Sequence, residues 1–97
     1  MSMFKFRKSK KVYVVVGTHY STDSGLSYSS LSEYGVLSTL KKAKRELDYI
    51  LADIKEDADW KDYDFNVRYD DSKTKMYIYY SFGDEDEYEI HERIIDF

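Results

Sequence analysis

Six carboxylates fall within nine positions of the stretch FGDEDEYEIHE, residues 82–92 of the sequence. Carboxylates at this density can bind a hard cation, which takes several oxygen ligands, or can present negative charge to a basic partner. The spacing argues against a calcium loop, because Gly83 precedes the acids, whereas an EF-hand needs an internal glycine and ligands at alternate positions. We therefore predict no metal site and no cofactor.

The same stretch can be divided into a turn at residues 83–86 and the start of a strand. In a strand, Glu87 and Glu89 project to one side at intervals of about 6.6 to 6.8 Å, while Tyr88 and Ile90 project to the other. This spacing predicts a line of negative charge beside tyrosines, which suits the binding of a basic protein partner. The predicted partner-binding residues are Asp70, Asp71, Tyr77, Tyr79, Asp84, Glu85, Asp86, Glu87, Tyr88, Glu89 and Glu92.

His19 and His91 are the only histidines, and together they could act as a general acid and a general base. A small metal-independent ribonuclease would need such a pair. No flanking signature accompanies either histidine, so catalysis is an alternative hypothesis rather than the leading one. The alternative is a small histidine-dependent nuclease or nucleotide-binding protein.

Charge is divided along the sequence. Residues 1–45 contain nine Lys and Arg against two acids, whereas residues 46–97 contain six against seventeen. The basic half could bind nucleic acid through phosphate contacts, with Phe4 and Phe6 stacking on bases, although the overall pI of about 5.1 weighs against a dedicated nucleic-acid binder. The residues of this second alternative are Lys5, Arg7, Lys8, Lys10, Lys11, Lys41, Lys42, Lys44 and Arg45.

The composition limits the class of protein. Aromatic residues make up 18% of the chain, and a core of this size cannot hide so many rings, so we expect tyrosines on the surface. The absence of cysteine excludes disulfides, thiolate zinc sites and thiol nucleophiles. No apolar run approaches the roughly 18 residues of a membrane span, so we predict a soluble cytoplasmic protein that does not contact membranes.

Hydrophobic periodicity predicts the fold. Residues 10–20 are predicted to form a strand that is apolar on both faces, with Val12, Val14 and Val16 on one face and Tyr13 and Val15 on the other, which is typical of a central strand. A helix is expected after an N-cap at Ser38, and period-2 alternation beyond Trp60 predicts three strands in an antiparallel meander. The predicted helix has a single apolar stripe at spacings of three and four residues, formed by Leu40, Ala43, Leu47, Ile50, Leu51, Ile54 and Ala58. We expect a basic N-terminus at residues 1–10 and one α+β domain at 11–97.

The predicted architecture is an antiparallel sheet of four to five strands with one long helix packed on one face, in the order β-(β)-α-β-β-β. The other face would carry Tyr77 and Tyr79, with Tyr13 and Val15 beside them. A partner, or a second copy of the chain in a homodimer, could cover it.

The segments VYVVVG and YGVLSTLKKAKREL, followed by a meander rich in Tyr, Asp and Glu, give the chain a familiar pattern. It resembles the small accessory proteins of phages and prophages of Gram-positive bacteria, a group that includes anti-CRISPR and other anti-defence inhibitors. The resemblance implies that the protein binds and blocks a host protein, often a nucleic-acid enzyme such as a defence nuclease, in the host cell cytoplasm. It assigns no function to individual positions.

Overall fold

The computed structural model describes the backbone of residues 9–23 and 26–96 and the side chains of residues 9–21 and 35–95. Lys5, Arg7 and Lys8, predicted as nucleic-acid contacts, lie outside the described residues. The elements are β1 (Ser9–Asp23), β2 (Leu26–Leu37), α1 (Leu40–Lys61), β3 (Phe65–Tyr69), β4 (Lys75–Tyr80) and β5 (Glu85–Asp96).

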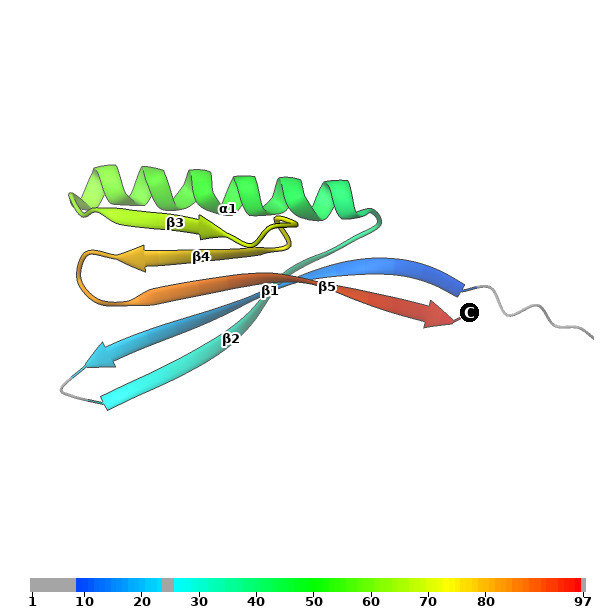
Figure 1. Ribbon diagram of the computed structural model, residues 1–97, viewed down its shortest axis with the longest axis horizontal. Helices are drawn as coiled ribbons and strands as arrows, with labels where there is room; N and C mark the ends of the chain where they lie inside the picture. The colour runs from blue at the N-terminus through cyan, green and yellow to red at the C-terminus, as the bar shows by residue number, and fades with distance from the viewer. Residues whose placement is uncertain (1–8, 24–25, 97) are drawn as a thin grey trace, which may run out of the picture.

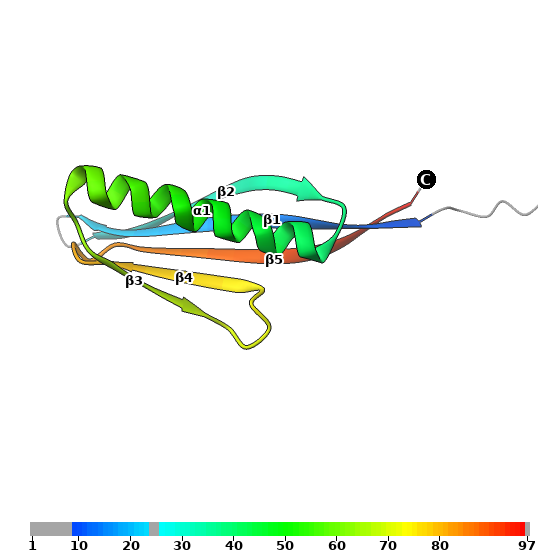
Figure 2. The same cartoon turned by 90° about the horizontal axis from the view of Figure 1, so that it is seen from above.

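The five strands form one antiparallel sheet in the order β2-β1-β5-β4-β3, and α1 packs against one face of it (Figures 1 and 2). The predicted α+β architecture is therefore confirmed. The first strand is internal, as its two apolar faces predicted, because it pairs with β2 along one edge and with β5 along the other. The strands β3, β4 and β5 form the expected meander.

Both ends of α1 have a clear physical cause. Thr39 is the N-cap, one residue later than predicted, and its extended backbone (φ −137°, ψ 154°) lets its hydroxyl accept a hydrogen bond from the Lys42 N–H at 3.1 Å. The helix ends at Asp62, whose left-handed backbone (φ 57°) turns the chain away while its own N–H donates to the Ala58 carbonyl.

The turn between β4 and β5 is shorter than predicted. Gly83 adopts φ 98°, a conformation that side chains disfavour, and its N–H donates to the Tyr80 carbonyl at 3.0 Å. Glu85 and Asp86, which we expected in the turn, already belong to β5. Strand alternation therefore begins two residues earlier, and it sends these two acidic side chains to opposite faces of the sheet.

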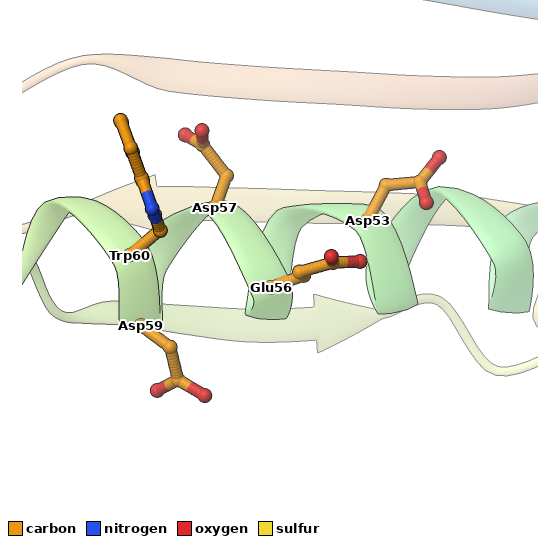
Figure 3. Close-up of a pocket in the computed structure, with 5 residues that line it drawn as sticks. All are labelled: Asp53, Glu56, Asp57, Asp59 and Trp60. Atoms are coloured by element: carbon orange, nitrogen blue, oxygen red, sulfur yellow. The ribbon is translucent and has the colours of Figure 1, made fainter.

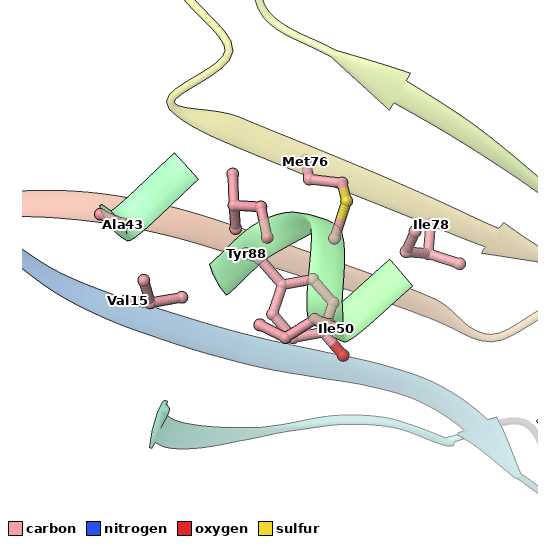
Figure 4. Close-up of a cluster of buried hydrophobic side chains, with 7 residues drawn as sticks. Val15, Ala43, Ile50, Met76, Ile78 and Tyr88 are labelled. Atoms are coloured by element: carbon pink, nitrogen blue, oxygen red, sulfur yellow. The ribbon is translucent and has the colours of Figure 1, made fainter. Parts of the chain in front are cut away.

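The core lies between α1 and the sheet. Its fully buried side chains include Val15, Leu47, Met76 and Ile78, which are at most 1% exposed. Figure 4 shows Val15, Met76 and Ile78 in this cluster. Leu47 lies on the predicted apolar stripe of the helix, together with the buried Ala43, Ile50 and Ala58.

The prediction that Tyr13 and Val15 lie on the uncovered face was wrong. Val15 is completely buried in the core under α1, and Tyr13 packs against the same core. The alternate positions Val14 and Val16 occupy the uncovered face instead. The sequence could not decide between the two orientations, because this strand is apolar on both sides and its periodicity does not say which side meets the helix.

The basic and acidic halves of the sequence meet in the sheet, where β1 pairs with β5, but along α1 the basic residues lie apart from most of the acidic ones. The first turn of α1 and the start of β1 lie at one end of the molecule, and the last turn of α1 and the β4–β5 turn lie at the other (Figure 1). Residues 41–45, with four basic side chains, therefore sit at the opposite end from the acids of residues 53–64. No helix in the described part of the chain is long and apolar enough to cross a membrane.

Candidate functional site

The sheet face opposite α1 carries a line of glutamates between tyrosines. Because Met76, Ile78 and Tyr88 point into the core, their neighbours in β4 and β5 point the other way. In the register, Tyr79 pairs with Glu85 and Tyr77 with Glu87, while β1 places Tyr20 beside Glu85 from the other side. We call this surface the tyrosine face, and it consists of Tyr20, Tyr77, Tyr79, Glu85, Glu87 and Glu89.

A shallow hollow of about 270 Å³ lies in the tyrosine face. Glu85 and Glu87 line it together with the three tyrosines and Asp86. Tyr20 closes one side, and its hydroxyl donates to Oε2 of Glu87 at 3.3 Å. The hollow therefore combines aromatic walls with carboxylate oxygens.

The charges on this face are unevenly neutralised. Glu89 contacts two basic groups, His91 Nε2 at 3.0 Å and Lys75 Nζ at 3.7 Å. In contrast, no Lys, Arg or His among the described residues forms an ion pair with Glu85 or Glu87.

The pKa values show the same excess of negative charge. Burial raises the pKa of Glu87, because it disfavours the ionised carboxylate, and the hydrogen bond and negative charge of the neighbouring Glu89 raise it further. The negative charge of Glu87 also raises the pKa of the Tyr20 hydroxyl. The surface is therefore arranged to favour the approach of a positive group.

A second polar group lies on the opposite, helix-facing side of the sheet. Asp86 Oδ1 contacts His19 Nδ1, while Asp86 Oδ2 accepts hydrogen bonds from Tyr80 at 2.5 Å and from Tyr88 at 3.2 Å. Asp84 Oδ2 lies 3.2 Å from His19 Nε2. We call His19, Ser21, Tyr80, Asp84, Asp86 and Tyr88 the His19 cluster.

The His19 cluster satisfies its own polar groups. Ser21, which is buried, donates to Asp84 Oδ1 at 3.3 Å, so both oxygens of that carboxylate are engaged. The hydrogen bond to Asp86, followed by the charges of both aspartates, raises the pKa of His19 despite partial burial. Burial and the hydrogen bond to Asp86 raise the pKa of Tyr80. The arrangement fits an imidazolium that links β1 to the β4–β5 turn.

The structure divides the predicted partner-binding residues among several places. Glu85, Glu87, Glu89, Tyr77 and Tyr79 lie together on the tyrosine face. Asp84, Asp86 and Tyr88 lie on the other side of the sheet, in the His19 cluster. Their side chains are engaged within the protein, which leaves them less free to meet a partner.

The other predicted acids lie elsewhere. Glu92 is exposed and pairs with Lys11 at 3.6 Å, and Asp71 is exposed in the β3–β4 turn. Asp70 shapes that turn, because it accepts hydrogen bonds from the N–H groups of Thr74 at 2.8 Å and Lys75 at 2.9 Å. Burial would raise the pKa of Asp70, but these bonds and those from the Thr74 and Ser72 hydroxyls lower it to about 2.

The residues of the two alternatives are also separated. His19 faces the helix side and His91 faces the tyrosine side, so the structure does not bring these histidines together as an acid and base pair. No group of three or more His, Cys, Asp or Glu in residues 9–23 and 26–96 is arranged to hold a metal ion. Of the basic residues, Lys10 and Lys11 are exposed in β1, while Lys41, Lys42, Lys44 and Arg45 lie in the first two turns of α1.

The sequence analysis did not identify Trp60, which is 83% exposed near the end of α1. It lines a hollow of about 560 Å³ together with four acidic residues of the helix. Figure 3 shows Trp60, Asp53 and Asp57 pointing toward the same side of the helix. The signal was present in the sequence, because position 60 lies off the apolar stripe and a tryptophan there must face solvent. The acidic residues are Asp53, Glu56, Asp57 and Asp59.

Comparison of the chain with protein-family models, curated proteins and solved structures finds no match to any of them.

Proposed function

We propose that this is a non-enzymatic binding protein whose tyrosine face docks on a basic groove of a nucleic-acid-handling protein. The observation that carries the proposal is the line of Glu85, Glu87 and Glu89 on a sheet face that α1 leaves uncovered, flanked by tyrosines of β1 and β4. A groove that normally holds phosphates would meet carboxylates at regular spacing instead.

The two kinds of side chain on this face support different aspects of binding. Half-buried tyrosines such as Tyr77 and Tyr79 give rigid contact area with little loss of side-chain entropy. The glutamates steer the approach of a basic partner and suppress acidic ones, so association is expected to slow and weaken as salt rises. Both contributions are located on the same few strands.

The proposed action is inhibition by occupancy. A protein that fills the nucleic-acid groove of an enzyme blocks it without any chemistry of its own. The resemblance to phage anti-defence proteins favours a bacterial defence nuclease as the partner and the host cytoplasm as the place of action.

A capture experiment with two charge-matched variants tests the proposal. The tagged protein is incubated with a bacterial lysate at low salt, and bound proteins are then eluted by a salt step or by added duplex DNA or RNA. One variant carries Glu85→Gln, Glu87→Gln and Glu89→Gln. The control carries three neutralisations on the helix instead, Asp53→Asn, Glu56→Gln and Asp59→Asn.

We expect a nucleic-acid-binding protein that is retained by the wild type and by the helix control, lost with the tyrosine-face variant, and released by competing nucleic acid. Neutralising Asp84 and Asp86 would be a poorer test, because it would also disrupt the His19 cluster. The proposal fails if the two triple variants lose binding equally, or if nucleic acid does not compete with the captured protein.

A further inference from the structure

We infer that the hollow of the tyrosine face is a receptor for one arginine side chain of the partner. The inference rests on the proposed function and names the chemical group that the tyrosine face recognises. The hollow, of about 270 Å³, is smaller than the roughly 300 to 1,000 Å³ of typical small-molecule pockets, which suits a single inserted side chain rather than a folded segment.

The lining of the hollow matches a guanidinium group. Tyr77 and Tyr79 rise from β4 on one side and Tyr20 from β1 on the other, so a flat cation can lie against tyrosine rings. Glu85 and Glu87 between them offer carboxylate oxygens to the N–H fork of the guanidinium. Lysine fits less well, because its ammonium is a compact, strongly hydrated charge that neither stacks nor bonds in a fork.

The charges around the hollow point to the same occupant. Glu89, at the margin, already contacts Lys75 and His91, whereas no ion pair in the described part of the chain involves Glu85 or Glu87. Glu89 also lies beside the carboxylate of Glu87, whose pKa is raised first by burial and then by this neighbour. An inserted guanidinium would offset these negative charges, so the hollow is electrostatically complementary to a cation before a partner arrives.

The hollow beside Trp60 provides a natural comparison. It also combines an aromatic ring with carboxylates, but the described residues that line it all belong to α1, and Trp60 stands 83% exposed. A cation there would meet one ring and remain open to water, which weakens cation–π attraction. Glu56 in that hollow is therefore a charge-matched control for Glu87.

The test is an NMR titration of the ¹⁵N-labelled protein at low salt with two uncharged-ended tripeptides, acetyl-Gly-Arg-Gly-amide and acetyl-Gly-Lys-Gly-amide. We expect the arginine peptide to shift the amide signals of Tyr20, Tyr77 and Tyr79 and to bind about twofold to fivefold more tightly than the lysine peptide. Tyr79→Leu and Glu87→Gln should each weaken arginine binding about twofold to fivefold. Tyr79→Phe, which keeps the ring, should bind the arginine peptide more tightly than Tyr79→Leu does, and Glu56→Gln should leave arginine binding unchanged.

The inference is overturned if the two peptides bind equally, if Glu56→Gln weakens binding as much as Glu87→Gln, or if the shifts spread over all acidic surfaces. These outcomes are separable from failure of the proposed function. If the arginine peptide binds as expected but no nucleic-acid-binding protein is captured, the proposed function fails while the receptor remains. If a partner is captured through the glutamates but Tyr79→Leu has no effect in the titration, only the arginine receptor fails.

Discussion

Replacing Glu87 by glutamine should make the protein more stable, because the tyrosine face holds like charges close together and their repulsion destabilises the folded state. Glutamine has nearly the same shape and can still accept the hydrogen bond from Tyr20, so the change removes mainly the charge. The raised pKa of Glu87 shows that ionisation is disfavoured in the folded protein, first by burial and then by Glu89.

The size of the effect follows from the strand geometry. Glu87 and Glu89 are alternate residues of β5, so their backbones are roughly 6.7 Å apart. The carboxylates themselves lie closer, because a side-chain hydrogen bond joins Glu87 to Glu89, so this spacing gives a lower bound for the repulsion. Two unit charges roughly 6.7 Å apart repel by about 0.6 kcal/mol in water, and by about 0.3 kcal/mol when 0.1 M salt screens them. Removing one should raise the melting temperature of this 97-residue chain by about 1 to 5 °C.

The pH dependence gives the sharper test. A carboxyl whose folded pKa lies above its ordinary value of 4.5 leaves the protein more stable below that pH and less stable as pH rises through the folded pKa. Thermal unfolding followed by circular dichroism should therefore show a higher melting temperature for Glu87→Gln than for the wild type at pH 7.5, and equal melting temperatures near pH 3. Adding salt at pH 7.5 should reduce the difference in melting temperature between the two proteins.

Glu56→Gln is the control, because it removes one charge from the exposed surface of α1 without touching the sheet. We expect it to change the melting temperature less than Glu87→Gln does. The reasoning is refuted if glutamine at position 87 lowers the melting temperature at pH 7.5, or if its gain persists unchanged at pH 3.

Three further changes test other parts of the structure. Leu47→Ala removes a core side chain that is 1% exposed and should lower the free energy of unfolding by about 2 to 5 kcal/mol in urea titrations, and a smaller loss would contradict the described core. The free energy of unfolding of the wild type should fall as pH rises from 6.5 through the raised pKa of His19, and His19→Gln should abolish this fall. Urea unfolding at pH 6 and pH 9 measures it, and an equal fall in both proteins would exclude the imidazolium link. Asp62→Gly relieves a left-handed backbone at the end of α1 and should raise the free energy of unfolding by up to about 1 kcal/mol, with destabilisation as the contrary result.

Local periodicity was sufficient to predict the helix and the meander. The stripe through Leu47 and Ile50 repeats at three and four residues, and the alternation of Met76 and Ile78 with tyrosines repeats at two. The same alternation also predicted that Glu87 and Glu89 point away from Tyr88. These features depend on neighbours in the chain, so the sequence contains them directly.

The sequence predicted only in part how the acidic residues 84–92 divide between the two faces of the sheet, because this division depends on strand register. Asp86 is bound by His19, which lies 67 positions away in the sequence and contacts it only because of the register between β1 and β5. Residue spacing in the sequence cannot predict such a contact. The face of β1 that meets α1 could not be predicted for a similar reason, because Val15 and Val16 are equally apolar and only the three-dimensional packing places Val15 under α1.

The pairing of β1 with β5 predicts that the sheet closes late in folding. The register joins Ser9 to Asp96 at one end and Tyr20 to Glu85 at the other, so the middle of the sheet is made from two segments far apart in the chain. The β1–β2 pair and the α1–β3–β4 segment can each form from local contacts. Bringing them together costs loop entropy, and this cost is offset only when β5 pairs with both β1 and β4. We therefore expect the sheet to be completed only when β5 pairs, and the expected kinetic result is single-exponential refolding on the millisecond-to-second scale typical of non-local sheets. Microsecond refolding would contradict this order of assembly.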